Sequence, residues 1–196
     1  GGTYTDAVLI RDETHVIATA KSLTTRADLA LAIGAVVRDV LAKAQVSAKD
    51  ISLASLSTTL ATNALVEGQG GRVGLIYIGF DARDLEVHGL KDALKGDPVI
   101  VITGGHDHSG SEVALLDEAG LRDWLAQDQG VSAFAVAAQF ATRNPAHEQR
   151  ASEMVSDITG RPVSASHHLS SKLNGPKRAL TAVLNARLIG LTHKLI

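Results

Sequence analysis

The sequence predicts an α/β fold in two lobes. Segments rich in Val and Ile alternate with segments whose apolar residues recur every three or four positions, the pattern of strands and helices packed together. A glycine-rich break at residues 68–71 divides the 196-residue chain. We expect a first lobe over residues 1–68, a second α/β lobe over 69–170, and a last helix within 171–196 that packs back on the first lobe or begins a further part.

The first lobe is predicted to contain a hairpin, a helix and a third strand. Residues 6–10 and 16–20 are short apolar segments joined by a polar turn, as in hairpin strands. Residues 51–56 are apolar enough for a buried strand. Between them, apolar residues at helical spacing predict a helix with this buried face: Leu29, Ala32, Ile33, Val36, Val37, Val40, Leu41 and Ala44.

Strands and helices alternate in the second lobe. Runs of Val and Ile predict strands over residues 73–78, 99–103, 131–139 and 162–166. One helix follows Asp117, and a second begins at Asn144 and Pro145 and ends at Gly160. The last helix carries these residues on one side: Leu180, Val183, Leu184, Leu188, Leu191 and Leu195. This alternation predicts a mainly parallel or mixed sheet.

The composition excludes several classes of protein. Hydrophobic residues make up 45% of the chain and charged residues 20%, as in folded globular proteins. The net charge of -2 and the 3% of aromatic residues argue against binding nucleic acid or anionic lipid. The chain has no cysteine, which excludes thiolate chemistry and favours a cytoplasmic location. The longest apolar run, 131–141, is shorter than the roughly 20 residues of a membrane span, and no secretory signal is recognised.

The opening residues, Gly1-Gly2-Thr3-Tyr4-Thr5-Asp6, form a candidate phosphate-binding turn. Glycine lets backbone N–H groups approach an anion closely, and threonine hydroxyls add donors. A plain hairpin turn explains the same residues.

A second cluster of hydroxyl and amide groups lies at residues 57–63. It contains Ser57, Thr58, Thr59 and Asn63, where a predicted strand leads into a short helix. A helix N-terminus offers free N–H groups to an anion. The same side chains are also common helix caps.

Four stretches together resemble the hydantoinase/oxoprolinase family. The first is the opening turn followed by Lys21-Ser22-Leu23-Thr24-Thr25, and the second is the segment from Thr58 to Glu67, which contains Ala-Thr-Asn-Ala-Leu. The third is Asn144-Pro145-Ala146-His147-Glu148, and the fourth is Thr181-Ala182-Val183-Leu184-Asn185-Ala186. They occur in the family's order along essentially the whole chain.

The resemblance implies an actin-like ATPase fold, in which ATP binds between two ribonuclease-H-like halves. The first lobe would be a ribonuclease-H-like lobe without its usual first strand, and the last helix would lead back to it or begin the second ATPase half. The implied cofactors are ATP and Mg²⁺; no catalytic or metal-ligating residue is assigned. The residues assigned to cofactor binding are Gly2, Thr3, Thr5, Thr58, Thr59 and Asn63.

The same resemblance implies the N-terminal region of a subunit of an ATP-dependent hydrolase for cyclic amides such as hydantoin or 5-oxoproline. ATP would phosphorylate the lactam oxygen, and water would then open the ring. Family members often work with a second, separately encoded subunit, so we expect a hetero-oligomer. An actin-like site needs both halves, so the chain by itself is expected to be inactive.

Three alternatives remain beside this interpretation. Related family members carboxylate ketones. A small-molecule kinase would share the actin-like fold. A non-catalytic lobe that docks a partner subunit would also fit the sequence.

Two pairs of histidines are candidate metal ligands. In an extended strand His106 and His108 would face the same side, as a metal pair requires. Two neutral imidazoles leave a divalent ion short of its usual three or four ligands, so an exposed polar turn is the favoured interpretation. His167 and His168 would point to opposite faces of a strand, which argues against a joint metal site.

Overall fold

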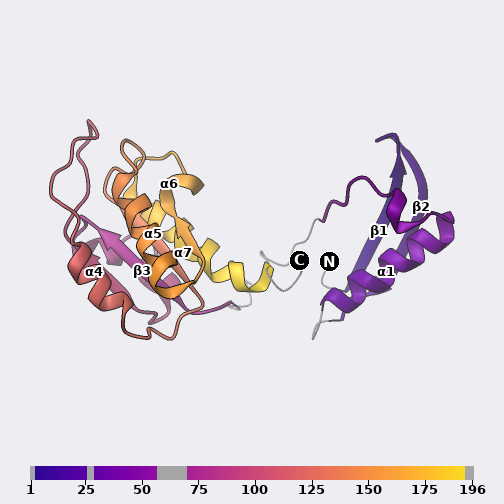
Figure 1. Ribbon diagram of the computed structural model, residues 1–196, viewed down its shortest axis with the longest axis horizontal. Coiled ribbons are helices and arrows are strands. Elements are labelled where there is room, and N and C mark those ends of the chain that lie inside the picture. Colours follow the sequence, from indigo (N-terminus) through magenta and orange to yellow (C-terminus); the bar gives the residue numbers. More distant parts are fainter. Residues whose placement is uncertain (1–2, 26–28, 57–69, 193–196) are drawn as a thin grey trace. The chain divides into compact units, whose positions relative to one another are not determined.

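Figure 1 shows the computed structural model of the chain, which describes residues 3–25, 29–56 and 70–192. The chain divides into two compact units, residues 1–69 with 192–196 and residues 70–191. The first unit contains an antiparallel hairpin and a helix, and the second contains a parallel sheet with helices on both faces.

Strands β1 (Tyr4–Arg11) and β2 (His15–Leu23) form the antiparallel hairpin that the sequence predicts. Asp12 and Glu13 turn the chain between them with φ of 52° and 60°. This left-handed conformation is uncommon outside glycine, although Asp adopts it more readily than most residues. A shift in register after Leu9 marks a bulge in the ladder.

Helix α1 (Leu29–Ala44) covers one face of the hairpin (Figure 1), which confirms the predicted helix. Val36 and Val40 are buried against the strand residues that face the helix: Ala7, Leu9, Ala18 and Ala20. Val37, expected on the buried face, is instead 43% exposed. Two strands cover only part of the apolar side of the helix, so the buried stripe is narrower than the sequence pattern.

The strand predicted over residues 51–56 is wrong. A 3-10 turn (Ala48–Asp50) capped by Ser47 follows α1, and residues 51–56 then continue without regular structure. Leu53 is 82% exposed. A strand needs a partner for its N–H and C=O groups. In the described part of this unit the sheet consists of β1 and β2 alone.

The second unit is built on a parallel sheet of four strands, in the order β4-β3-β5-β6. The strands are β3 (Val73–Ile78), β4 (Val99–Ile102), β5 (Ala133–Ala138) and β6 (Val163–Ala165). All four occur where the sequence predicts strands. Every residue of the central strands β3 and β5 is buried, which explains their unbroken apolar sequence.

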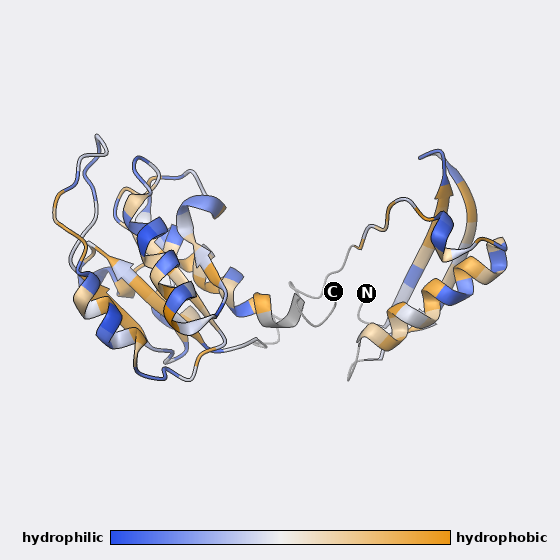
Figure 2. Cartoon of the chain, in the orientation of Figure 1, coloured by the Kyte–Doolittle hydropathy of each residue, from blue (hydrophilic) through white to orange (hydrophobic). Residues whose placement is uncertain are grey.

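Helices cover both faces of this sheet (Figure 1). Helices α4 (Glu118–Leu125) and α5 (Ala146–Thr159) pack on the face that carries Ile76. Helices α3 (Leu90–Leu94) and α7 (Gly175–Thr192) pack on the face that carries Leu75. Neighbouring strand residues thus enter opposite cores, and Figure 2 shows the strands coloured largely as hydrophobic. The α/β prediction is confirmed.

Helix α7 belongs to the second unit as far as Leu191. These four residues are buried in the core beneath β3 and β5: Ala179, Ala182, Val183 and Ala186. These small side chains let α7 lie close to the sheet. Without the helix, this apolar face of the parallel sheet would be exposed to water. That the last helix leads back to the first lobe or begins a further ATPase half stays a prediction.

Two short elements and the caps complete the second unit. A 3-10 turn (Ala82–Glu86) follows β3, and α6 (Ser166–Leu169) follows β6. Asn144 Oδ1 accepts a hydrogen bond from the N–H of Ala146 (3.1 Å) at the start of α5, and Gly160 ends that helix with φ 63°. None of the helices in the described part of the chain is long and apolar enough to cross a bilayer.

The strand order determines where a ligand site is expected. From β3 the chain moves to β4 on one side of the sheet and then returns to β5 on the other. In open parallel sheets, ligands bind outside the carboxyl ends of the strands at such a reversal. Here the reversal lies between β3 and β5.

Candidate functional site

The described part of the predicted phosphate turn lies at one end of the hairpin. Thr24 N–H donates to the carbonyl oxygen of Thr3 (3.0 Å), and the hydroxyls of Thr5 and Thr24 lie 3.1 Å apart. Thr3 is exposed and Thr5 is half-buried. The structure therefore places Thr3 and Thr5, two of the predicted cofactor-binding residues, beside Thr24, which carries a third hydroxyl. Gly2, Thr58, Thr59 and Asn63 lie outside the described residues.

This hairpin end offers neutral donors and one carboxylate. Asp6 follows Thr5, lies 3.6 Å from Lys21 Nζ, and both side chains are more than half exposed. Hydroxyl groups suit phosphate oxygens, so Thr3, Thr5 and Thr24 fit a phosphate-binding end. In the described part of the chain no three His, Asp or Glu side chains form a cluster able to hold a metal ion.

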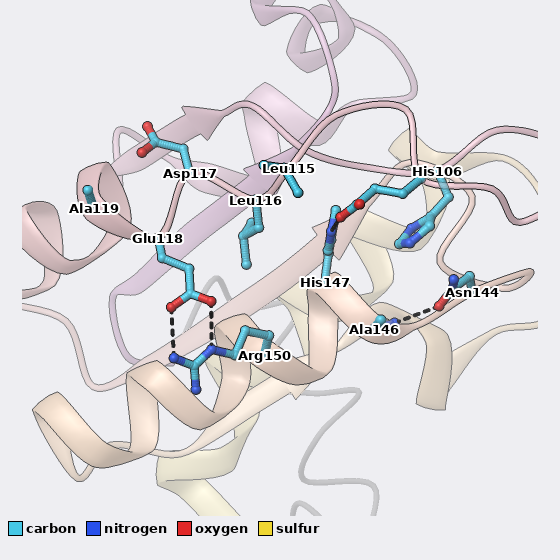
Figure 3. Close-up of a pocket in the computed structure, with 11 residues that line it drawn as sticks. His106, Leu115, Leu116, Asp117, Glu118, Ala119, Asn144, Ala146, His147 and Arg150 are labelled. Carbon is cyan, nitrogen blue, oxygen red and sulfur yellow. Dashed lines mark hydrogen bonds and ion pairs between the residues drawn. The ribbon is translucent and has the colours of Figure 1, made fainter.

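A pocket of about 780 Å³ lies beside the carboxyl end of β4 in the second unit (Figure 3). It is formed by the loop that joins β4 to α4 and by the first turns of α4 and α5. The lining residues are His106, Glu112, Leu115, Leu116, Asp117, Glu118, Ala119, Asn144, Ala146, His147 and Arg150. This volume is within the range of about 300–1,000 Å³ that is usual for small-molecule sites.

Three glycines bring the loop close to the sheet. Gly79 follows β3, and Gly104 and Gly105 follow β4. Their φ angles are positive, at 76°, 144° and 92°. A Cβ atom on Gly79 would lie 2.5 Å from the carbonyl oxygen of Gly104. Only glycine permits this approach, which turns the chain back over the sheet edge at His106.

His147 is fixed on both sides of its ring. The N–H of Gly105 donates to His147 Nδ1 (2.8 Å), so Nδ1 acts as the acceptor. The proton of the neutral ring is then on Nε2, which lies 2.7 Å from Glu112 Oε1 and donates to it. Both nitrogens are engaged, and His147 therefore holds the loop in place.

His106 lies beside it, and in the described part of the chain one of its ring nitrogens has no hydrogen-bond partner. The residue is 2% exposed, and its ring centroid is 4.5 Å from that of His147. Nδ1 is buried without a hydrogen-bond partner among the described residues. Burial, together with the neighbouring His147, lowers the pKa of His106 below its ordinary value, so the ring is neutral near pH 7.

The expectation of an exposed turn is therefore wrong for His106. It holds for His108, which is exposed. The two side chains lie in different environments because the chain turns back at Asp107, whose N–H donates to the carbonyl of Ser111 (2.9 Å).

The one lysine or arginine of the pocket is already paired. Arg150 donates from Nε and Nη2 to the two oxygens of Glu118 at 2.8 and 2.7 Å (Figure 3). This two-point contact raises the pKa of Arg150 and lowers that of Glu118. Asp117 Oδ1 accepts from the N–H of Gly120 (2.9 Å) as a helix cap.

A buried polar network lies at the neighbouring strand ends. Glu148 is fully buried, and its oxygens accept hydrogen bonds from Ala138 N–H (2.7 Å), the Ser166 hydroxyl (2.6 Å), His167 N–H (2.9 Å) and His167 Nδ1 (2.6 Å). Arg178 is 1% exposed and donates from Nε to Ser166 Oγ (3.2 Å). Burial lowers the pKa of Arg178, and the Glu148 carboxylate opposes that shift.

The network also corrects the reading of His167 and His168 as strand residues. Both lie in the short helix α6, with ring centroids 4.0 Å apart. The N–H of His167 donates to Glu148 Oε2 (2.9 Å) at the start of this helical turn, which directly follows β6.

The comparison with known families matches residues 1–159 to the hydantoinase/oxoprolinase N-terminal region. This chain belongs to the hydantoinase/oxoprolinase family. It is 33% identical to the acetophenone carboxylase gamma subunit of Aromatoleum aromaticum and 32% identical to the caprolactamase subunit alpha of Pseudomonas jessenii. In both cases the similarity covers 96% of this chain and 30% of the relative.

Two solved structures resemble this family member over 99% of its length. The ATP-dependent caprolactamase of Pseudomonas jessenii matches with a TM-score of 0.75 and 27% identity, over 31% of that chain. A nucleotide-free acetone carboxylase matches with a TM-score of 0.69 and 22% identity, over 32% of that chain. At this lower identity, the similarity to acetone carboxylase shows a shared fold only.

Sequence reasoning missed the pocket and the buried network of this hydantoinase/oxoprolinase chain. It assigned no role to Glu112, His147, Glu148 or Arg178. One signal was present, because the stretch Asn144-Pro145-Ala146-His147-Glu148 contributes to the family resemblance. Its two ionisable residues are buried in the first turn of α5.

Proposed function

We propose that the chain is the N-terminal region of a subunit of an ATP-dependent enzyme that hydrolyses cyclic amides. The observation that carries this proposal is the similarity to the ATP-dependent caprolactamase, which extends over 99% of this chain at 27% identity. The chain spans about 30% of the length of the relatives that it matches, so the activity belongs to a longer protein in this proposal.

The hairpin end is the proposed phosphate-binding part. Thr3 and Thr5 would donate hydrogen bonds to phosphate oxygens, together with Gly2 and with Thr58, Thr59 and Asn63. In support, the hydroxyls of Thr5 and Thr24 lie together at the strand ends. The described residues include no cluster for Mg²⁺, which in phosphoryl-transfer sites is held largely by phosphates, water and one or two carboxylates. We assign no residue to the metal.

The proposed reaction converts a lactam, water and ATP into an amino acid, ADP and phosphate. ATP, when bound, supplies the phosphoryl group that activates the lactam oxygen. Donors held in place by the fold stabilise the charge that moves during such a transfer. The fold of the first unit as a ribonuclease-H-like lobe is part of the same proposal.

Carboxylation of a ketone is the second candidate function. It is favoured by the 33% identity to the acetophenone carboxylase gamma subunit. Both of these relatives are subunits, which supports the proposal that a second kind of subunit completes the enzyme.

The deciding experiment uses the full-length subunit co-purified with its partner subunit. One arm contains ATP and a panel of lactams, and the other contains ATP, bicarbonate and a panel of ketones. Phosphate and the acid product are measured in each arm. Phosphate release coupled to ring opening supports the proposal, whereas phosphate release coupled only to a carboxylated ketone selects the second candidate. If neither acid forms, both assignments are wrong.

A further inference from the structure

The pocket beside β4 contains few polar atoms that are free to meet a ligand. His147 uses both ring nitrogens, and the side chain of Asn144 bonds to Gly110 O (3.1 Å) and Ala146 N (3.1 Å). Among the described residues, Nδ1 of His106 is buried without a hydrogen-bond partner, and Glu112 contacts His147 through one of its two oxygens, Oε1. The backbones of His106 and Glu112 form an isolated antiparallel β-bridge, which places their side chains next to each other on one side of the loop.

The charges in the pocket oppose an anionic ligand. Arg150 already makes a two-point contact with Glu118, His147 accepts a hydrogen bond at Nδ1, and burial favours the neutral form of His106. The carboxylates of Glu112 and Asp117 remain on the lining. Phosphate, bicarbonate or a carboxylic acid would meet negative charge here without an unpaired cation to offset it.

The rest of the lining suits an apolar body. Leu115, Leu116, Ala119 and Ala146 contribute carbon atoms around the opening (Figure 3). Leu115 is 78% exposed, which is unusual for a large apolar side chain and leaves it able to cover a ligand. A small neutral ring with one polar edge matches this combination better than a nucleotide.

We propose that this pocket binds the neutral cyclic amide, with the ring against Leu115, Leu116 and Ala146 and the amide between His106 and Glu112. The proposal rests on the proposed lactam hydrolysis and assigns its substrate-binding residues. In a lactam the C=O and N–H lie on the same edge of a cis amide. A neutral imidazole can donate to the C=O, while a carboxylate oxygen can accept from the N–H.

The first test is binding to the 196-residue chain, followed by NMR of its backbone amides. The probes are a seven-membered lactam, the cyclic ketone of the same ring size, and inorganic phosphate. We expect the lactam to shift the amide signals of Gly105, Glu112 and Leu116 saturably, and the ketone to bind roughly tenfold more weakly because it lacks one hydrogen bond. We expect no shift of these signals with phosphate. Equal binding of phosphate, or lactam shifts confined to other residues, would overturn the proposal.

His106→Phe tests the donor. Phenylalanine keeps a flat ring beside His147 and removes a buried nitrogen that has no partner, so the variant is expected to fold. Its lactam affinity should fall roughly tenfold, whereas His108→Phe, at the exposed position two residues later, should bind like the parent. Unchanged affinity in His106→Phe would remove His106 from the site.

Glu112→Gln tests the acceptor and the identity of the ligand together. The carbonyl oxygen of glutamine can still accept the hydrogen bond from His147. Its amide N–H₂, however, takes the place of the carboxylate oxygen that would accept the lactam N–H. Lactam affinity should fall by a similar factor, and ketone affinity should remain within about twofold because a ketone offers no N–H. A parallel loss for both ligands would show that Glu112 only supports the loop.

Kinetics of the full-length enzyme separate this proposal from the proposed function. With ATP saturating, His106→Phe should raise the KM for the lactam roughly tenfold and leave the KM for ATP unchanged. If ring opening proceeds with an unaltered lactam KM, the function stands and the pocket assignment is wrong. If the wild-type enzyme opens no lactam while NMR still shows saturable binding at Gly105, the proposed function is wrong.

Discussion

Arg187 Nη2 lies 2.7 Å from Asp97 Oδ2, and both side chains are buried. Ninety residues separate them in the sequence. Arg187 comes from α7, and Asp97 lies just before β4 and also accepts from Arg72 Nε (3.2 Å) and Val73 N–H (3.0 Å). The pair ties the last helix to the amino ends of the central strands.

Asp97→Ala should therefore destabilise the second unit strongly. It leaves the Arg187 guanidinium buried without its carboxylate, and breaking a buried pair in this way typically costs about 3–5 kcal/mol. Trp124 is the only tryptophan of the chain and packs on Phe134 in the core of this unit, so its fluorescence reports the unfolding transition in urea. Glu86→Ala, which breaks an exposed pair with Lys91, is the matched control and should leave the midpoint unchanged. Equal midpoints for the two variants would contradict the importance of the buried pair.

A comparison of Val36→Asp with Val37→Asp tests the register of α1. Val36 is 2% exposed and Val37 is 43% exposed, although they are neighbours on the same helix. Burying an unpaired carboxylate costs several kcal/mol, so Val36→Asp should unfold the first unit, with a measurable loss of helical circular dichroism. Val37→Asp should retain most of that signal. The opposite order would mean that the helix packs on the hairpin through a different face.

The pH dependence of stability offers a check on His106. Its pKa is lowered in the folded chain, whereas the unfolded chain takes up the proton near the ordinary value of 6.5. As the pH falls below that value, the unfolded state binds more protons than the folded state, and stability declines. Above it both states are neutral and His106 contributes nothing.

His106→Phe should therefore lose less stability than the parent between about pH 7.5 and pH 5.5. The variant has no imidazole at this position that takes up a proton when the chain unfolds. Urea midpoints of both proteins at the two pH values measure this difference, and carboxylates that titrate in both proteins cancel in the comparison. A parallel decline in the two proteins would mean that His106 protonates normally in the folded chain.

Local sequence signals predicted most of the regular structure. Helix α5 begins and ends where Asn144 and Gly160 indicate, since a cap and a left-handed glycine act within a few residues. The central strands were found because burial on both faces makes them continuously apolar. Residues 51–56 have a similar apolar character but no partner strand in the described part of the unit, and pairing cannot be read from one segment alone.

The candidate site depended on contacts between distant segments. His106 and His147 are 41 positions apart, and they meet because two glycines after β4 turn the loop over the sheet edge. The sequence around His106 is equally typical of an exposed turn, because none of the adjacent residues indicates which side of the loop is buried. Glu148 occupies the first turn of α5, where an acidic residue ordinarily faces water and favours the helix dipole. Its burial follows from the positions of β6 and α7.

Thr5→Val in the full-length enzyme tests the proposed phosphate end of the hairpin. Valine has nearly the same shape as threonine but lacks the hydroxyl that lies 3.1 Å from the hydroxyl of Thr24. Because β1 is a strand and valine favours strands, the fold should be retained. The loss of a hydrogen bond to a charged phosphate, worth about 1.5–3 kcal/mol, should lower lactam-dependent phosphate release at least tenfold. Thr19→Val, on the exposed side of β2, changes the same chemical group away from this end and should leave phosphate release unaltered. If the two variants release phosphate equally well, the Thr5 hydroxyl makes no contact with the nucleotide, and the phosphates must be bound elsewhere.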